Sequence, residues 1–209
     1  MNKINPVIGN PRIQNEIEHL VLPLLKSKRT YLDIGACIGK ASKAFVDVFD
    51  NVVAFEPNPE SLSVLKEISG IKIKEVAVSD YIGTTEFIVP NCSKSHERGF
   101  ISNNIDVEDS TKYTVDVVTI DSYKFENVDF IKIDTEGNEL NVLNGAIKTI
   151  KKYKPIIYYE DKGKTDKDLK RRSEIEKLLQ ELGYNTQRTR RYWQKDKQSK
   201  ADMLAIPKN

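Results

Sequence analysis

The sequence is poor in the residues from which metal centres and disulfide frameworks are built. Its 209 residues include only 2 cysteines and 2 histidines. The cysteines, Cys37 and Cys92, are too few for a disulfide framework or for a zinc site of their own. No histidine accompanies the acidic motifs described below, so we assign no metal site from the sequence.

Long hydrophobic runs are also missing. No apolar stretch approaches the roughly 20 residues that a membrane-spanning helix needs. The first residues, Met1 to Pro6, lack the apolar core of a secretory signal. Together with the scarcity of cysteine, this predicts a cytoplasmic protein in a reducing compartment, with no membrane span.

The chain has little excess charge, with 33 Lys and Arg against 31 Asp and Glu. A net charge of +2 neither requires nor excludes a polyanionic partner. With 39% hydrophobic residues and no internal repeat or low-complexity linker, the chain suits one domain. We expect residues 1–29 to be a helical segment that packs on the core, and residues 30–209 to be a single domain with an insertion at about 81–118.

Apolar runs that end at turn residues alternate with amphipathic segments. The pattern predicts strands at 30–34, 51–55, 71–79, 128–134 and 155–160, with helices at 40–49, 60–68, 140–150 and 167–182. Such alternation is typical of parallel βαβ units. Two further strand-like pieces, 184–193 and 202–207, are expected to close the sheet as an antiparallel hairpin. The fold class is therefore α/β, with a mostly parallel sheet and helices on both faces.

Acidic residues recur where these strands end. Asp33, Glu56, Asp134 and Glu160 end four strands, and Asp80 lies just past a fifth. Ligands of open parallel sheets bind at the carboxyl ends of the strands, and a sheet does not need acids there for its stability. The recurrence predicts a polar ligand with several hydroxyl groups.

The first strand is followed by a glycine turn in which Gly35 and Gly39 are four residues apart. This spacing differs from the G-x-G-x-x-G of dinucleotide folds, and no P-loop lysine follows, so a ligand without pyrophosphate is favoured. Glu56 lies about 20 residues further on, where a carboxylate can accept hydrogen bonds from ribose hydroxyls. Its alternative role is to cap the next helix.

Several motifs in register resemble the FkbM family of class I methyltransferases, over about residues 30–161. The matching segments are Tyr31-Leu32-Asp33-Ile34-Gly35-Ala36-x-x-Gly39, Ala54-Phe55-Glu56-Pro57-Asn58-Pro59, Val76-Ala77-Val78-Ser79-Asp80-x-x-Gly83, Ile131-Lys132-Ile133-Asp134-Thr135-Glu136-Gly137-x-Glu139-Leu140 and Pro155-Ile156-Ile157-x-x-Glu160. Family members usually carry Val at the position of Thr135.

The resemblance implies a seven-stranded Rossmann-like sheet and S-adenosylmethionine as methyl donor. It places Asp33, Gly35, Ala36 and Gly39 around the methionine end of the donor, and Glu56 at the ribose. Pro57 and Asn58 would lie beside the sugar and adenine, and Val78, Ser79 and Asp80 would line the adenine pocket. The turn from Asp134 to Gly137 would face the sulfonium and the methyl acceptor.

A hydroxyl acceptor must lose a proton, which a nearby carboxylate can take. Our candidates for this base are Asp134, Glu136 and Glu160, in that order. Each has an alternative role: Asp134 could only orient the donor, Glu136 could cap the next helix, and Glu160 could pair with Lys162. Asp134 and Glu136 could also share a divalent cation.

The resemblance favours a hydroxyl on a sugar, glycan or small metabolite as acceptor. His96 and Arg98, in a polar loop of the insertion, and Asn103 are the candidate substrate-binding residues. RNA is an alternative, because basic and aromatic residues alternate between Arg188 and Lys197, and because Lys132, Asp134, Glu160 and Lys162 loosely resemble the tetrad of ribose 2′-O-methyltransferases. The alternative that is not an enzyme is a non-catalytic, cofactor-binding partner subunit of another enzyme.

Overall fold

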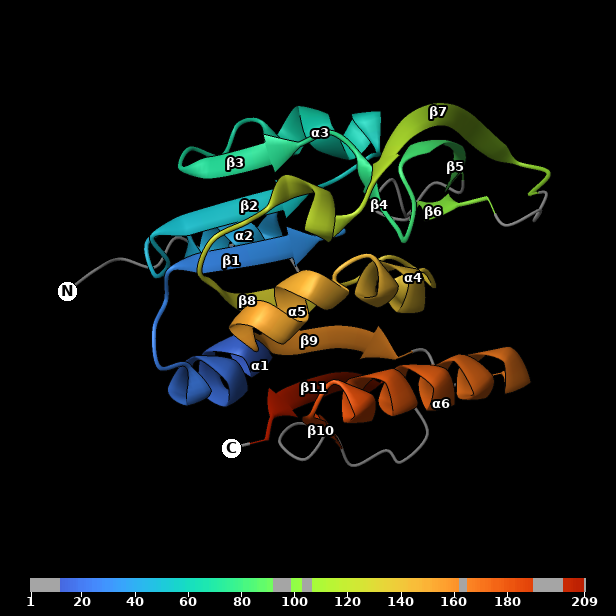
Figure 1. Ribbon diagram of the computed structural model, residues 1–209. Helices are drawn as coiled ribbons and strands as arrows, with labels where there is room; N and C mark the ends of the chain where they lie inside the picture. Colours follow the sequence, from blue (N-terminus) through green and yellow to red (C-terminus); the bar gives the residue numbers. More distant parts are fainter. Residues whose placement is uncertain (1–11, 92–98, 103–106, 162–164, 190–200, 209) are drawn as a thin grey trace.

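A seven-stranded sheet forms the centre of the protein, seen here in a computed structural model that describes residues 12–91, 99–102, 107–161, 165–189 and 201–208 (Figure 1). The strand order is β10-β11-β9-β8-β1-β2-β3. The strands are β1 Thr30–Ile34, β2 Asn51–Phe55, β3 Ile71–Lys74, β8 Val128–Ile133, β9 Ile156–Asp161, β10 Tyr184–Arg188 and β11 Ala201–Pro207. All neighbours pair in parallel except β11, which is antiparallel to both β9 and β10. The predicted α/β sheet with an antiparallel C-terminal hairpin is confirmed.

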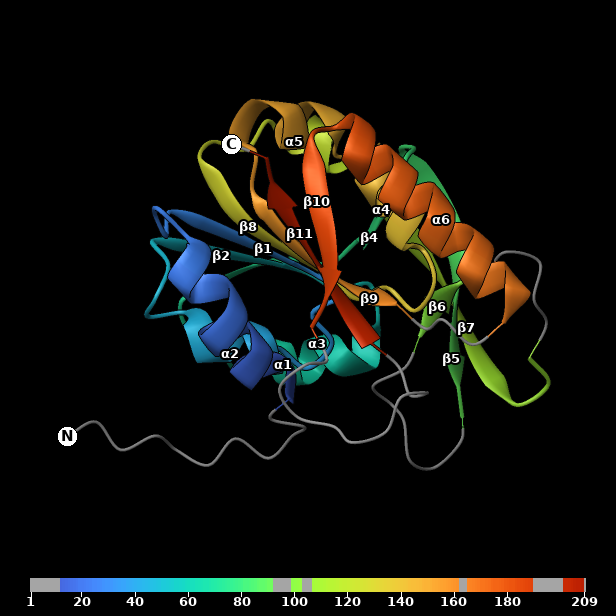
Figure 2. The ribbon, with the colours of Figure 1, turned by 90° about the horizontal axis from the view of Figure 1, so that it is seen from below.

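Helices cover both faces of this sheet, as the view along it shows (Figure 2). One face carries α1 Arg12–Glu16, α2 Lys40–Phe45 and α3 Pro59–Leu65. The other carries α4 Glu139–Asn144, α5 Ile147–Tyr153 and α6 Asp166–Glu181. Residues 17–21 continue α1 as a π-helical turn, and residues 22–24 as a 3-10 turn. None of the described helices is long and apolar enough to cross a membrane.

The two faces bury separate apolar clusters, which explains why the central strands read as continuous apolar runs. Leu32 of β1 packs with residues of α4, α5 and α6 in the first cluster. Its neighbour Tyr31 points to the opposite face, where its ring stacks on Phe130 with 4.9 Å between the centroids. Both faces of β1 are therefore closed to solvent.

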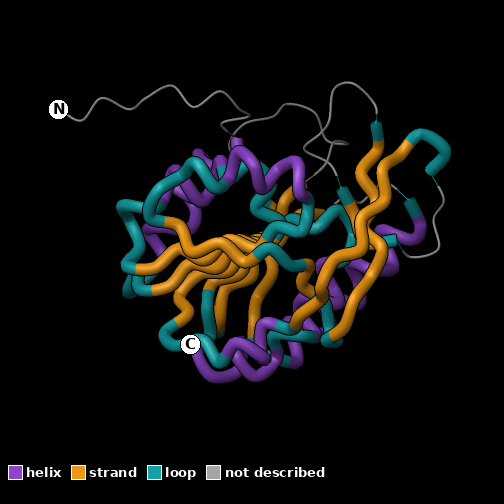
Figure 3. Tube along the Cα trace, turned by 90° about the horizontal axis from the view of Figure 1, so that it is seen from above, coloured by secondary structure: helices purple, strands orange, loops and turns teal. Residues whose placement is uncertain are grey.

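The insertion, together with residues 77–78 just before it, forms a second sheet beside the first (Figure 3). Its strands are β4 Ala77–Val78, β5 Gly83–Pro90, β6 Phe100–Ile101 and β7 Ser110–Val118, in the order β4-β7-β5-β6. The single strand predicted at 71–79 is wrong in this respect. It ends at Lys74, and Ala77 and Val78 pair with Val117 and Val118 of β7 instead of continuing along β2.

The helix predicted at 140–150 is also divided, into α4 and α5, around Gly145. A Cβ at this glycine would lie 2.0 Å from the carbonyl oxygen of Ser79, so the chain passes directly against the end of β4 here. The break therefore lets the helical layer and the second sheet meet. A 3-10 turn at Ile120–Tyr123, which the sequence analysis did not predict, connects β7 to the central sheet.

Candidate functional site

A cavity of about 540 Å³ opens at the carboxyl ends of β1, β2 and β8. Its volume lies within the usual range for small-molecule sites. The strand-end turns contribute Gly35, Ala36, Glu56, Pro57, Asp134 and Glu136 to its wall. Other parts of the wall come from Ile13 and Gln14 of α1, from Lys40 and Ala41 of α2, and from the second sheet, including Val78, Phe87 and Ile101. The cavity is thus shared between the central sheet, the N-terminal helix and the insertion.

The turn after β1, residues 35–39, lies against two neighbouring strands. The backbone N–H groups of Gly35 and Ala36 both donate to the carbonyl oxygen of Phe55, at 3.0 and 3.1 Å. Gly35 has φ +74°, and a Cβ there would lie 1.9 Å from the carbonyl oxygen of Asp134. Glycine is therefore required at this position both by the left-handed backbone and by the close approach of the turn after β8.

Below this turn lies a buried ion pair between Asp33 and Lys132. Asp33 is fully buried and accepts hydrogen bonds from Lys132 Nζ at 2.9 Å and from Ser42 Oγ at 2.6 Å. Lys132 also donates to the carbonyl oxygen of Gly35 at 3.2 Å. Burial lowers the pKa of Lys132, but the carboxylates of Asp33 and Asp134 outweigh burial and leave that pKa above its ordinary value. Asp33 supports the turn through Lys132. Asp33 lies outside the cavity wall, whereas Lys132 is part of it.

Glu56 presents a buried carboxylate to the cavity. Its two oxygens accept the backbone N–H groups of Cys37 at 2.7 Å and Asn58 at 2.8 Å. Burial raises the pKa of Glu56 to about 7, although these two N–H groups act in the opposite direction. Each carboxylate oxygen can accept a further hydrogen bond, so both remain able to receive a ribose hydroxyl. The cap of α3 is Asn58, whose side chain accepts from the N–H of Glu60 at 3.0 Å.

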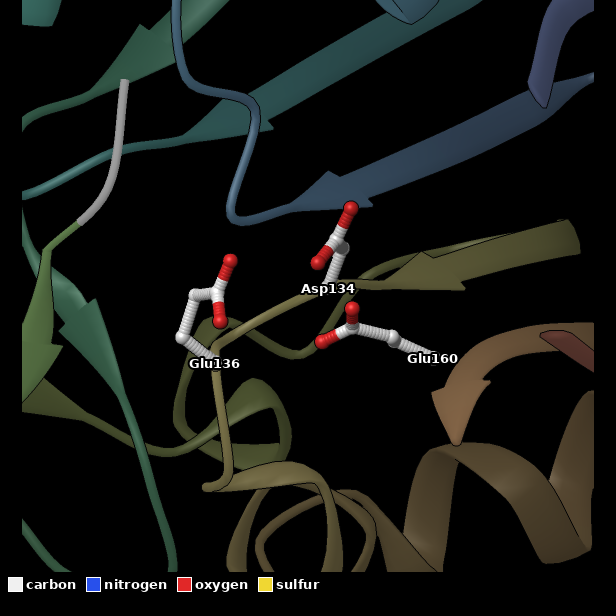
Figure 4. A group of neighbouring side chains, drawn as sticks. All are labelled: Asp134, Glu136 and Glu160. Carbon is white, nitrogen blue, oxygen red and sulfur yellow. The ribbon is translucent and has the colours of Figure 1, made fainter. Parts of the chain in front are cut away.

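Three carboxylates lie close together near the carboxyl ends of β8 and β9 (Figure 4). Asp134, Glu136 and Glu160 each offer an oxygen, and these atoms all lie within 4.8 Å of one another. Asp134 and Glu136 belong to the cavity wall, whereas Glu160 comes from the end of β9 behind them. Such a group can accept a proton from a hydroxyl, and close carboxylates can also coordinate a divalent cation. The structure therefore brings together the three residues considered as the base.

The turn that carries Asp134 and Glu136 is held by a residue that the sequence analysis did not single out. Glu139 is 1% exposed, and its Oε1 accepts from Gly137 N at 2.9 Å and from both Thr135 N and Thr135 Oγ1 at 3.2 Å. Glu139 therefore binds the N–H groups of this turn. An acid in the first turn of the following helix was the available signal.

The other predicted site residues are distributed around this centre. Val78 lines the cavity, and its carbonyl oxygen accepts from Asn138 Nδ2 at 2.9 Å. Ser79 donates to Asp80 at 3.2 Å, and both lie outside the cavity wall with Gly39 and Asn58. His96, Arg98, Asn103 and Lys162 lie outside the described residues, as does the segment from residue 190 to residue 197.

Comparisons with known proteins agree with this geometry. The model of the methyltransferase FkbM domain matches residues 33–186. No curated protein matches the sequence. The structure is similar to a methyltransferase FkbM from Methylobacillus flagellatus KT, with a TM-score of 0.61, 21% identity, and coverage of 90% of this chain and 47% of that one. The chain thus spans about half the length of that relative.

Two further solved structures share the fold. One is precorrin-6y C5,15-methyltransferase from Geobacter metallireducens, with a TM-score of 0.56, 12% identity and coverage of 97% and 90%. The other is a protein from Streptococcus mutans described as a methyltransferase, in complex with SAH, with a TM-score of 0.54, 11% identity and coverage of 96% and 99%. Since the family model covers more than half of the chain, the protein belongs to the methyltransferase FkbM domain family, whose methyl donor is S-adenosylmethionine.

Proposed function

We propose that this protein transfers a methyl group from S-adenosylmethionine to a hydroxyl of a sugar, glycan or small metabolite. The observation that carries this proposal is the group of three carboxylates, Asp134, Glu136 and Glu160, the first two of which line the same cavity as Glu56. A hydroxyl is a weak nucleophile until its proton is removed, and carboxylates at the reacting centre supply a base.

The donor end of the cavity suits a nucleoside. When bound, S-adenosylmethionine supplies a methyl group that its sulfonium activates. Glu56 would accept the ribose hydroxyls, with Pro57 beside the sugar and Val78 against the adenine. Gly35 and Ala36 would lie along the methionine, because their turn contacts Glu56 through the N–H of Cys37 and the backbone of Asp134 through Gly35. What these residues contribute is orientation and the exclusion of water.

Asp134 is our first candidate for the base at the acceptor end. It follows β8 directly and lines the cavity, and its Oδ2 is 4.0 Å from Lys132 Nζ. Lys132 would stay positively charged, because its pKa is raised by the carboxylates beside it once burial is offset. A permanently charged lysine cannot itself take the proton, so it would act by orienting Asp134 through their ion pair.

The charge of the cavity favours a neutral acceptor over RNA. Glu56, Asp134 and Glu136 all line it, and the charge of Lys132 is already compensated by Asp33. Although Lys40 also lines the cavity, phosphate groups entering beside Asp134 and Glu136 would be repelled, whereas a polyhydroxyl compound could donate hydrogen bonds to these two carboxylates.

Transfer of labelled methyl to a panel of glycans, hydroxylated metabolites and RNA tests this proposal. We expect label on a hydroxylated glycan or metabolite, and a loss of about 100-fold or more in rate for Asp134→Asn. The control is Asp116→Asn, which changes the same charge at an exposed position of β7. SAH should bind both variants within a few-fold of wild type, as measured by calorimetry.

Three outcomes would overturn parts of the proposal. Label on RNA alone would replace the acceptor class. Binding of SAH with no transfer to any class would favour the non-catalytic partner. A folded protein that does not bind SAH at millimolar concentration would remove the donor assignment itself.

A further inference from the structure

Two neighbouring arginines of α6 reach the two segments that carry the acidic group. We propose that Arg171 and Arg172 are positioning residues for the acceptor end of the cavity, Arg171 through the turn that carries Glu136 and Arg172 through the strand end that carries Glu160. The inference rests on the proposed function, in which these acids face the acceptor.

Arg171 makes three contacts, two of them to the turn after β8 and its anchor. Its guanidinium donates to the carbonyl oxygen of Gly137 at 3.2 Å, and its Nε lies 3.7 Å from Oε2 of Glu139. A third contact, to Asp168 at 2.7 Å within α6, fixes the side chain itself. Arg171 therefore binds both the backbone of the turn and the carboxylate that holds its N–H groups.

The backbone of the turn shows why it needs such support. Glu136 has φ +55° and Gly137 has φ +121°, so two successive residues lie in the left-handed half of conformational space. For a glutamate this conformation carries a cost and persists only when its surroundings impose it. A Cβ at position 137 would lie 3.2 Å from the Arg171 guanidinium, so glycine also leaves room for the arginine.

The anchor carboxylate depends on Arg171 as well. Burial raises the pKa of Glu139, while the Gly137 N–H group and the charge of Arg171 act in the opposite direction. Without Arg171, a buried carboxylate would lose its cation, which is costly for a charged group removed from water. Loss of the arginine therefore loosens the turn at both its N–H and its carbonyl groups.

Arg172 points to the neighbouring strand end. It forms an ion pair with Asp161, the last residue of β9, and both side chains are largely buried, at 17% and 6% exposure. Asp161 directly follows Glu160, so fixing one residue fixes the backbone from which the other projects. Because adjacent residues of a helix point in different directions, one turn of α6 holds both acid-bearing segments.

Arg171→Met and Arg172→Met test the proposal, with Lys170→Met as the matched control. Lys170 is exposed on the same helix, and its substitution removes the same charge. Three quantities are measured for each variant: SAH affinity by calorimetry, hydrogen exchange of the Thr135 and Gly137 amides by NMR, and kcat and KM for the acceptor found in the labelling panel.

We expect kcat to fall about tenfold to 100-fold in both arginine variants, because small misplacements of catalytic groups have effects of this size. SAH affinity should stay within threefold of wild type, since neither arginine lines the cavity. Amide exchange at Thr135 and Gly137 should become about tenfold faster in Arg171→Met alone. Arg172→Lys should restore kcat by keeping a cation beside Asp161, whereas Arg171→Lys should restore it only in part, because an ammonium lacks the fork that serves three acceptors.

A kcat equal to that of Lys170→Met in both arginine variants would overturn the proposal, and so would unchanged amide exchange in Arg171→Met. Faster exchange with an unchanged kcat would show a purely structural contact. If no acceptor in the panel is labelled, the proposed function fails there, and the amide exchange still decides whether Arg171 holds the turn.

Discussion

The turn after β1 and the turn after β8 are built alike and line the same cavity side by side. Each follows a buried parallel strand, and each contains residues of positive φ, Gly35, Cys37 and Gly39 in the first and Glu136 and Gly137 in the second. A buried glutamate from outside each turn accepts from its backbone: Glu56 accepts the N–H of Cys37 in the first, and Glu139 accepts the N–H groups of Thr135 and Gly137 in the second.

The two glutamates differ in what lies on their other side. Glu56 lines the cavity, and the hydrogen bonds that it accepts within the described part of the chain come from backbone N–H groups. Glu139 lies outside the cavity wall and faces Arg171. A buried carboxylate at a strand-end turn is therefore not in itself a ligand site. The neighbouring group, open cavity or arginine, decides whether the carboxylate can serve a ligand or only the backbone.

The largest difference between the two turns is expected in the unfolding free energy when the first glycine of each turn is replaced by alanine. Gly35→Ala should cost about 4 kcal/mol, because overpacking against a backbone oxygen adds to the strain of positive φ. Gly137→Ala meets only the end of a flexible arginine and should cost about 2 kcal/mol. Urea unfolding measures both. Gly83→Ala is the control, since a Cβ there would touch nothing closer than 3.7 Å; equal costs for Gly35→Ala and Gly137→Ala would contradict the comparison.

Replacing each glutamate by glutamine should next distinguish ligand contact from backbone support. Glu56→Gln should weaken SAH binding about 10- to 100-fold, because hydrogen bonds to a charged acceptor contribute about 1.5–3 kcal/mol. Glu139→Gln should leave SAH affinity within about threefold, since it keeps the oxygen that binds the turn and adds no group to the cavity. Calorimetry at pH 8 measures both. A larger loss of SAH affinity in Glu139→Gln than in Glu56→Gln would contradict this distinction between the two glutamates.

The pKa of about 7 for Glu56 should make SAH binding depend on pH. The ionised form accepts the ribose hydroxyls, so affinity should be about tenfold lower at pH 6 than at its plateau above about pH 8. Glu56→Gln should show no such slope. Titration calorimetry from pH 5.5 to pH 8.5 is the measurement, and a flat wild-type profile would count against the assignment.

The same pKa has an effect of opposite sense on stability without ligand. The folded-state pKa of about 7 lies above the ordinary value of 4.5, so the folded state holds this proton more tightly than the unfolded state. The contribution of Glu56 is fully present below pH 4.5 and is lost as pH rises through 7, by up to about 3 kcal/mol. Unfolding of wild type and Glu56→Gln at pH 5 and pH 8 isolates this contribution.

The smallest effect is expected at the start of α6, which supports the second turn. Thr165 and Asp168 form a capping box there, and Asp168 also binds Arg171. Thr165→Ala should cost about 1 kcal/mol in unfolding free energy, and Thr165→Ser should cost less than half of that. A loss in the alanine variant that also weakened SAH binding would show that the two turns are coupled.

The central sheet was largely predictable from the sequence, because local patterns of apolar residues indicate its strands. The buried runs ending at Asp33, Glu56 and Asp134 were located from apolar residues and the turn residues that follow. The break between Lys74 and Ala77 was not, because the residues of the predicted strand remain suited to a strand throughout. Only the pairing of β4 with β7, some 40 residues away, decides where the strand leaves the central sheet.

The acids of the site were predicted because they follow local sequence patterns. The residues that support them were missed because their contacts join distant parts of the chain. Glu56 stands at a recognisable distance from the glycine turn. Arg171 lies 34 residues from Gly137, whose carbonyl it binds, within a helix whose many charges look like a solvated face. Which of those charged side chains is buried depends on how α6 packs against the rest of the protein, and the local residue spacing does not indicate this.

The place of β11 between β9 and β10 has a consequence for biosynthesis. On the ribosome, β10 emerges before β11, yet β11 is the strand with which it pairs. Until β11 has emerged, β9 keeps an open edge and β10 has no place in the sheet. Such unpaired edges are where nascent chains associate wrongly. We therefore expect chaperone demand during synthesis to concentrate on the interval between these two strands.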